Sequence, residues 1–528
     1  MSGRKSRWLG FGLVATAGAG VLGLSAMMNP AFASADNIGL VIGGSADPIP
    51  GPGYVEAADL LYLNNQAEMT PLYPDLTFYQ ATSTNPDDPG FFGNGLFTPE
   101  GAYPLFGQGV QQLYYNYPLN SDGLPSLSTS VGQGAAILES TILADQAAGD
   151  GSTVLGYSQS STIAGVTMQL LDPTGANESE TANAPQFLLL ADLNNPNGGI
   201  LERFNGFETT SGQSTVDPLN LASLGFSFNG ATPSDDYVTN IYSLEYDGFT
   251  DFPRYPLNLL SDVNAFLGIE DLHGTYLNGG VDGSGPTAEQ IANATLLPGS
   301  MDPGTDFPGN PDSLTNYFMI DETAPLVSAL PQPLQELLGP DLTYLINLGY
   351  GDGSLGYSVT ADSPANVPTP FGLFPDVSLS TVLSTLATDT EQGFQNLISG
   401  TDPYSAAADP ATSAISATTV PDLLSALEAD AANPAASFTE LVNAISSAAS
   451  TAYSLLLPTA DIVNSLVTSL PSWETSIFTD TLSTGDVVDA LGLPVAGTFA
   501  IGTLAAGFEI SIVSDAASQI AADFSGLF

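Results

Sequence analysis

The pentapeptide GYSQS, at residues 156–160, lies between two segments of different periodicity. Residues 153–155 before it predict a β-strand, and residues 160–171 after it (SSTIAGVTMQLL) predict a proline-free helix. A serine on a tight turn between a strand and a helix needs small neighbours, because the two elements nearly touch there. Gly156 and Ser160 meet that need. The pattern predicts Ser158 as a nucleophile on such a turn, with an ordinary strand-to-helix bend as the alternative.

Strands alternate with helices along the first two thirds of the chain. Apolar runs at 38–42, 187–191 and 238–246 predict strands, and residues 137–148 predict a helix. This alternation is typical of an α/β protein with a mainly parallel sheet that is flanked by helices on both faces. We therefore expect an α/β protein followed by a helical C-terminal region. The Ser158 turn is of the kind that α/β-hydrolases use for their nucleophile, so the α/β-hydrolase fold is the one expected.

His273 is the only histidine among 528 residues. A serine hydroxyl is a weak nucleophile at neutral pH, and it needs a positioned imidazole that is held by a carboxylate. If the chain is a serine hydrolase, His273 must be the base. Gly274 after it allows the sharp loop that would present such a side chain, although a lone histidine bonded to backbone is the plainer interpretation.

The other site residues follow from chain order, which in α/β-hydrolases runs nucleophile, acid, histidine. Asp251 lies a few residues beyond the strand that ends in YSLEY, so we expect it to be the triad acid, with Asp247 as the alternative. An oxyanion hole takes one backbone N–H from the residue after the nucleophile and one from the loop after an early strand. Those residues are Gln159 and Ser45, with Gly44 as the alternative to Ser45.

The N-terminus has the layout of a signal peptide. Three of the five basic residues precede an apolar run, and Ala-x-Ala sites occur at 31–33 and 33–35. We expect export with cleavage near residue 35, giving a secreted or cell-envelope protein; an uncleaved anchor is the alternative. The mature chain would keep only Arg203 and Arg254 as basic residues, against 56 acidic ones.

This charge balance excludes several classes of partner. A chain with two arginines and no lysine cannot neutralise phosphates, so nucleic acid and anionic membrane surfaces are poor partners. The chain has no cysteine, and it shows no metal-binding motif or cofactor signature. We expect no cofactor, no metal ion and no protein partner.

Several further segments resemble one known family, the PE-PPE domain family of cutinase-like serine α/β-hydrolases. They are GGSADPIPG at 43–51, GYSQSS at 156–161, NNPNGGILERF at 194–204, YDGFTDFPRYPLN at 246–258, LHGTY at 272–276, and the stretch from TNYFMIDETAPLV to LINLGYGD at 315–352. A serine at the fifth position of the pentapeptide is itself typical of that family. Both remaining arginines fall inside these segments.

The resemblance implies an esterase that acts on short- to medium-chain acyl esters. The alternatives are an acyltransferase that moves acyl groups onto trehalose-type glycolipids, with contact to envelope lipids, and a non-catalytic envelope protein on a hydrolase scaffold. We accordingly divide the chain into a signal peptide (1–35), a PE-PPE-type hydrolase domain (36–363) and a C-terminal region (364–528). A signal-peptide-like segment stands where family members carry a helical PE or PPE module.

The C-terminal region is rich in Ala, Ser, Leu and Thr, and residues 420–431 and 438–457 have helical periodicity. Residues 491–513 are apolar enough to suggest a membrane anchor. Pro494, Glu509 and the lack of flanking basic residues argue against one. We expect buried or lid-forming helices here.

Overall fold

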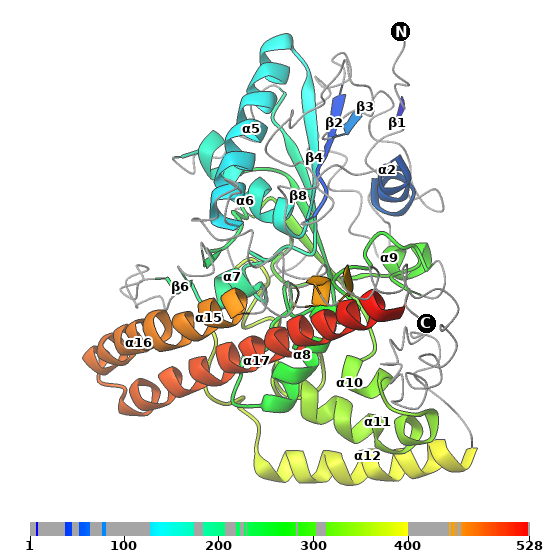
Figure 1. Cartoon of the computed structure of the whole chain (residues 1–528), viewed down its shortest axis with the longest axis vertical. Coiled ribbons are helices and arrows are strands. Elements are labelled where there is room, and N and C mark those ends of the chain that lie inside the picture. Colours follow the sequence, from blue (N-terminus) through cyan, green and yellow to red (C-terminus); the bar gives the residue numbers. More distant parts are fainter. Residues whose placement is uncertain are drawn as a thin grey trace.

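The computed structural model describes residues 7–8, 37–44, 52–63, 76–80, 127–173, 183–205, 218–221, 226–228, 230–280, 284–301, 313–399, 443–444, 446–448, 451 and 456–525. At its centre lies an eight-stranded sheet (Figure 1). In spatial order the strands are β1 (Arg7–Trp8), β3 (Leu76–Gln80), β2 (Asn37–Val41), β4 (Gly151–Tyr157), β5 (Gln186–Leu190), β8 (Thr239–Leu244), β10 (Thr315–Ile320) and β9 (Thr295–Leu296).

All neighbours from β3 to β10 pair in parallel, and only the two edge strands β1 and β9 are antiparallel. The predicted α/β fold with a mainly parallel sheet is therefore confirmed. Because parallel strands end at the same edge, the segments after β4 and β8 emerge close together, as does the one after β5 between them.

Both faces of this sheet are covered, which explains why its strands read as continuous apolar runs. In β5, Phe187 and Leu189 pack into one core cluster, while Leu188 and Leu190 pack into another on the opposite face. The first face is covered by α5 (Leu127–Ala148) and α6 (Gln159–Leu171), and the second by α2 (Pro52–Ala58), the adjoining turn η2 (Asp59–Leu63) and α9 (Ala288–Ala292) (Figure 1).

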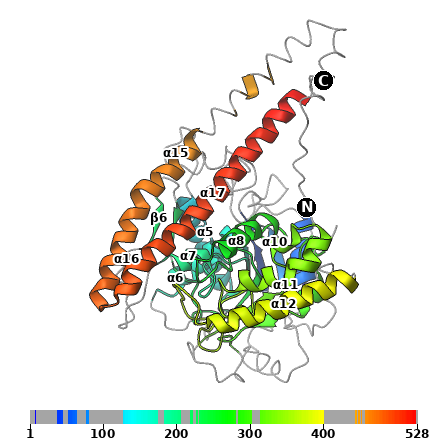
Figure 2. The ribbon, with the colours of Figure 1, turned by 90° about the horizontal axis from the view of Figure 1, so that it is seen from below.

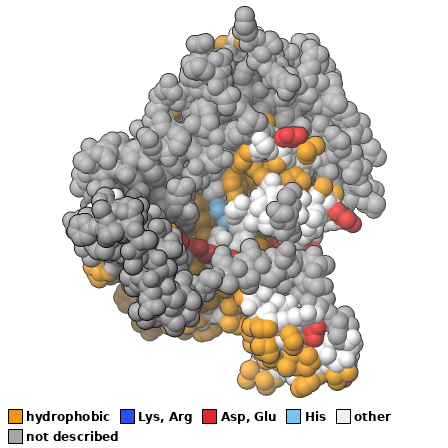
Figure 3. Space-filling model, turned by 45° about the vertical axis from the view of Figure 1, so that its right-hand side comes forward, with side chains coloured by type: hydrophobic (Ala, Val, Ile, Leu, Met, Phe, Trp, Pro, Cys, Tyr) orange, Lys and Arg blue, Asp and Glu red, His pale blue; other side chains and the backbone are white. Residues whose placement is uncertain are grey.

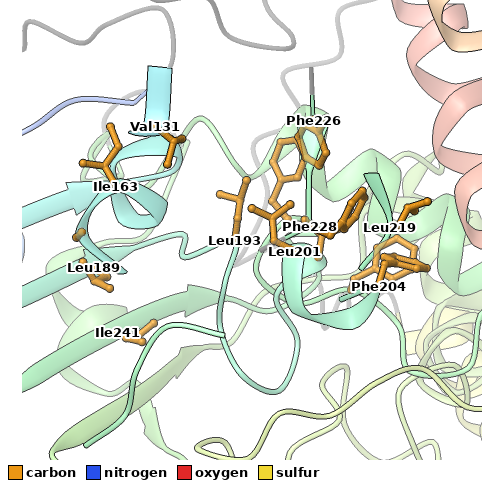
Figure 4. Packing of buried hydrophobic residues seen from close by; sticks show 14 of the residues in the cluster. Val131, Ile163, Leu189, Leu193, Leu201, Phe204, Leu219, Phe226, Phe228 and Ile241 are labelled. Atoms are coloured by element: carbon orange, nitrogen blue, oxygen red, sulfur yellow. The ribbon is translucent and has the colours of Figure 1, made fainter. Parts of the chain in front are cut away.

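The first cluster extends from the sheet to a small hairpin of β6 (Asn220–Leu221) and β7 (Phe226–Ser227), and to α7 (Ile200–Arg203) (Figure 4). Phe204 is fully buried at its centre, with ring contacts to Phe228, Phe252 and Phe371. This aromatic packing joins the loops at the carboxyl edge of the sheet to the C-terminal helices, since Phe204 also contacts Trp473.

The C-terminal helices form a hairpin that runs past the sheet and its covering helices (Figure 2). It consists of α15 (Leu456–Asn464), the π-helical turn η6 (Ser465–Ser469), α16 (Leu470–Thr484) and the long α17 (Val487–Ser525). Helix α17 packs on α16 and on α8 (Leu259–Asp271). A separate pair, α11 (Gln332–Asn347) and α12 (Leu379–Ser399), packs beside α10 (Pro325–Ser328).

The apolar stretch 491–513 lies within α17, and Pro494 does not interrupt that helix. By length and composition residues 487–522 could cross a membrane, and 39% of the apolar window is buried within the protein. The predicted signal peptide lies outside the described residues except for β1, and so does the predicted helix at 420–431. The domain boundary at 363 stays a prediction.

Candidate active site

Ser158 lies between β4 and α6, as the sequence predicts. Its backbone has φ 56° and ψ −120°, a conformation that a residue with a side chain rarely adopts. Ala191 after β5 and Tyr246 after β8 have positive φ as well, 52° and 68°. Residues with strained backbone thus follow three adjacent parallel strands at the same edge of the sheet. Strained backbone of this kind is common at functional sites.

The small residues beside Ser158 are required by contact distances. A Cβ at Gly156 would lie 2.7 Å from the backbone oxygen of Ser160, so any larger residue would separate the strand from the helix. Ser160 itself is 1% exposed. Its hydroxyl accepts a 2.7 Å hydrogen bond from the Tyr157 backbone N–H and donates to the carbonyl of Ile42 at 3.0 Å. The serine at the fifth position therefore ties the turn to β2.

His273 follows the C-terminus of α8, and two glycines bring that helix against the end of β8. A Cβ at Gly248 would meet the backbone of Ala265, and one at Gly268 would overlap the carbonyl of Tyr246. Backbone therefore packs directly on backbone between the acidic turn and α8. This contact places Asp247 beside His273, although the two are 26 residues apart in the chain.

The three side chains form an unbroken hydrogen-bonded series. His273 Nε2 lies 2.8 Å from Ser158 Oγ, and His273 Nδ1 lies 2.9 Å from Asp247 Oδ2. Asp247 is fully buried, and its Oδ1 accepts a 3.1 Å bond from the Phe249 N–H. This histidine–carboxylate contact is an ion pair when the imidazole is protonated. The arrangement has the geometry in which an imidazole accepts a serine proton while a carboxylate orients it.

The preference for Asp251 as the acid is corrected by this geometry. Asp251 Oδ2 accepts a 3.2 Å bond from the Tyr246 N–H, its Oδ1 has no hydrogen-bond partner, and neither oxygen bonds the histidine. The side chain is 1% exposed, and burial raises its pKa well above the usual value. The physical reason is the tight turn that begins at Leu244, where β8 ends: it directs Asp247 toward His273 and Asp251 into the interior.

Two tyrosines contact the triad without having been predicted to do so. Tyr276 donates a 2.9 Å hydrogen bond to Asp247 Oδ2. Tyr157 stacks against the His273 ring, with centroids 5.8 Å apart, and its hydroxyl donates to the His273 carbonyl. Burial raises the pKa of both phenols, so both stay protonated. Each lies in a motif that the sequence singles out, next to the serine or three residues after the histidine.

The predicted oxyanion hole is only partly within the described residues. Gln159 is the first residue of α6, so its backbone N–H lies at the positive end of that helix. Ser45 lies outside the part of the chain that the structure describes. Gly44, the alternative, lies against the nucleophile: a Cβ there would be 3.4 Å from Ser158 Cβ. Gly44 is therefore beside Ser158, and the oxyanion hole itself stays a prediction.

The histidine is partly accessible, and its side chain is 12% exposed. Figure 3 shows the pale blue of the single histidine at the bottom of a hollow that is lined on one side by hydrophobic side chains. Phe249 contacts the imidazole edge-to-face at 4.6 Å. The Phe508 ring of α17 stacks on the Phe249 ring with the ring centroids 6.5 Å apart. It also contacts the Phe266 ring of α8, with a centroid distance of 5.2 Å. An apolar path thus leads from the triad to the C-terminal helix.

Arg203 is 1% exposed and connects four loops near the site. Its guanidinium donates to Asn197 Oδ1, to Ser358 Oγ at 2.7 Å, and to the carbonyls of Phe252 and Thr369. Burial lowers its pKa to about 10. In the described part of the chain, no group of three or more His, Asp or Glu side chains is placed to hold a metal ion.

The fold and the arrangement of these side chains define an α/β-hydrolase-type protein. The model of the PE-PPE domain family matches residues 89–351, and the chain belongs to that family. A protein of Mycobacterium tuberculosis described as uncharacterized PPE family protein PPE28 is 35% identical over 519 residues, which cover 94% of this chain and 68% of that one.

Two further M. tuberculosis relatives match about half of this chain. Esterase PE16 is 40% identical over 293 residues, which cover 54% of this chain and 46% of the relative. PE family protein PE3 is 39% identical over 278 residues, 51% of each chain. This chain therefore spans about half the length of these two relatives. No solved structure gives a significant match.

Proposed function

We propose that this chain is an exported serine esterase that hydrolyses short- to medium-chain acyl esters through Ser158, His273 and Asp247. The observation that carries the proposal is the continuous series from Ser158 Oγ through the imidazole to Asp247 Oδ2, with contacts of 2.8 and 2.9 Å. The name of the relative Esterase PE16 supports the same reaction class.

In the first half-reaction His273 Nε2 takes the proton of Ser158 Oγ as that oxygen attacks the ester carbonyl. The negative charge that develops on the carbonyl oxygen is held by the backbone N–H of Gln159 and by one from the Gly44–Ser45 turn. The tetrahedral intermediate then collapses, and the alcohol leaves with the proton from His273. Asp247 holds the imidazole in the required tautomer.

In the second half-reaction water, deprotonated by His273, attacks the acyl-serine and releases the carboxylic acid. A sugar hydroxyl in place of water would make the same enzyme an acyltransferase. Adding trehalose to the ester assay separates these outcomes, because only transfer gives acylated sugar. The hydrophobic side chains on one side of the hollow favour an apolar acyl group as the bound part of the substrate.

The test uses a fluorophosphonate probe and a p-nitrophenyl butyrate assay on the purified protein. We expect a single labelled peptide that contains Ser158, and a loss of kcat/KM of about 1000-fold or more in Ser158→Ala and in His273→Ala. Ser140→Ala is the matched control, since Ser140 is an exposed hydroxyl on α5. Labelling at another serine, or hydrolysis that survives both triad variants, would overturn the proposal.

Export is the other half of the proposal. It rests on the layout of the first 35 residues. Expression of the full chain in a host with the general secretion pathway should give a culture or envelope fraction whose N-terminus, by mass spectrometry, begins near residue 34 or 36. An intact residue 1 in that fraction would indicate a retained anchor instead.

A further inference from the structure

Asp247 Oδ2 accepts two hydrogen bonds of equal length, one from His273 Nδ1 and one from the Tyr276 hydroxyl, both 2.9 Å. The Tyr276 oxygen in turn accepts a 2.8 Å bond from the Leu244 N–H. Since that backbone donor occupies an acceptor site of the phenol, the single phenolic proton is directed to Asp247. The proton direction on Tyr276 is therefore fixed by its surroundings.

Tyr276 is also held at its backbone. Its side chain is 0% exposed, and its carbonyl accepts a 2.8 Å bond from the Tyr62 hydroxyl. The Tyr157 ring lies 5.8 Å from it, on the side of the histidine. A phenol that is fixed at both ends presents its O–H at one position, which is what a group that orients a carboxylate must do.

We propose that Tyr276 is a positioning residue of the triad, whose hydroxyl holds Asp247 in place and shares its negative charge, so that less of that charge acts on His273. This inference rests on the proposed esterase function, because it assigns a role within that triad. The consequence to test is how strongly the Asp247 charge stabilises the protonated form of His273. A carboxylate oxygen with two donors stabilises a protonated imidazole less than one that has the imidazole as its only side-chain donor.

The groups that face His273 set the titration of its imidazole. They are Asp247 from the end of β8, Tyr157 from β4, Tyr276 from the loop after α8, and Ser158. Phe249 covers the remaining edge. Removing the Tyr276 hydroxyl leaves the other groups in place and concentrates the carboxylate charge on the imidazole. The imidazole then holds its proton to a higher pH.

Tyr276→Phe is the decisive variant, because it keeps the buried ring and removes one oxygen. The rising limb of kcat/KM against pH, which reports loss of the imidazole proton, should move upward by about half a pH unit or more. At pH 7 we expect kcat to fall about tenfold with KM little changed, since the substrate does not touch Tyr276.

The single histidine gives a readout that needs no activity. In untagged protein grown with ring-labelled histidine, one NMR signal reports the titration of His273. Its midpoint should move to higher pH in Tyr276→Phe by the same amount as the rate limb. An unchanged midpoint in a folded variant would overturn the inference, whereas a wild-type protein that the fluorophosphonate fails to label would overturn the esterase proposal instead.

Tyr62→Phe is the matched control. It also removes one buried phenolic hydroxyl from the same core cluster, and it too is expected to lower the unfolding temperature. Its hydroxyl bonds the Tyr276 backbone and not Asp247, so the titration midpoint should stay where the wild-type midpoint lies. A midpoint that moves equally in both variants would show that Tyr276 acts only through general packing.

Discussion

Exchange of each of two neighbouring carboxylates for an amide tests the assignment of the acid. Asp247 and Asp251 are four residues apart and almost equally buried, with 0% and 1% exposure. Burial therefore does not distinguish them, whereas their hydrogen bonds do. We expect Asp247→Asn to abolish most of the esterase activity and Asp251→Asn to change kcat/KM by no more than about threefold.

The size of the Asp247→Asn effect follows from its three donors. Two carboxylate oxygens accept from His273 Nδ1, the Tyr276 hydroxyl and the Phe249 N–H. An amide has only one oxygen, so in either orientation an NH₂ group faces a donor. If it faces the imidazole, the ring takes the tautomer with its proton on Nε2, which cannot accept the Ser158 proton. Loss of that tautomer costs about 10³- to 10⁴-fold, or about 4–5 kcal/mol of barrier.

Asp251→Asn should behave differently because burial raises the pKa of Asp251 well above its usual value. A raised pKa favours the protonated carboxyl, and an amide is a close substitute for that form whose oxygen still accepts from the Tyr246 N–H. A raised native pKa means that the native chain holds a proton that the unfolded chain releases. The contribution of Asp251 to the free energy of unfolding therefore falls as the pH rises, and Asp251→Asn should abolish that part of the pH dependence.

The assay is hydrolysis of p-nitrophenyl butyrate by both variants, with urea unfolding at pH 5 and pH 8 to show that each is folded. The reasoning is refuted if Asp251→Asn loses a thousandfold in kcat/KM while Asp247→Asn, equally folded, keeps most of its activity. Equal loss in both variants would also contradict it, because the structure gives Asp251 no bond to the imidazole.

Three further variants probe the packing around the site. Ser160→Ala leaves the buried Tyr157 N–H without its acceptor, so urea unfolding should show a loss of about 1–3 kcal/mol; an unchanged free energy would contradict that role. Gly268→Ala places a Cβ on the Tyr246 carbonyl and should cost about 1–3 kcal/mol and lower kcat, and wild-type values of both would show that α8 can move aside. Both carboxyl oxygens of Asp262 lack a hydrogen-bond partner, and burial raises its pKa to about 8. The contribution of this group to the free energy of unfolding is therefore fully present below about pH 4 and is lost as the pH rises toward 8. Asp262→Asn should therefore flatten the fall of stability between pH 4 and 8, about 1.4 kcal/mol per pH unit at most, and an undiminished slope by urea unfolding would refute the assignment.

The elements of the sheet could be predicted because their signals are local. The strand at 187–191 is apolar on both faces, and this matches a parallel strand that is covered on both sides, as β5 is. The turn at Ser158 could be predicted for the same reason, since Gly156 and Ser160 act within a few residues of it. The single histidine left one candidate for the base of any triad, and in the structure its Nε2 lies 2.8 Å from Ser158 Oγ.

Contacts between distant segments could not be predicted in the same way. Tyr276 meets Asp247 across 29 residues, and Phe508 reaches the Phe249 ring across more than 200. Neither pairing leaves a periodic or compositional signal in either segment. The long apolar helix is a similar case, because its length and composition would also allow a membrane span. Which one forms depends on surfaces elsewhere in the chain.

The sequence favoured Asp251 as the acid because the pattern predicts the wrong end for strand β8. Tyr and Leu favour strands, so the pattern extends β8 to Tyr246 and makes Asp251 the first acid well beyond its end. The strand stops at Leu244, and Tyr246 adopts φ 68° in a turn that is pressed against α8 at Gly268. Because the strand ends two residues earlier than the pattern predicts and a tight turn follows at once, Asp247 faces the histidine and Asp251, four residues further on, does not. Ser158 and His273 could thus be chosen as candidates from residue types, whereas the choice between two aspartates depended on a backbone contact that only the fold supplies.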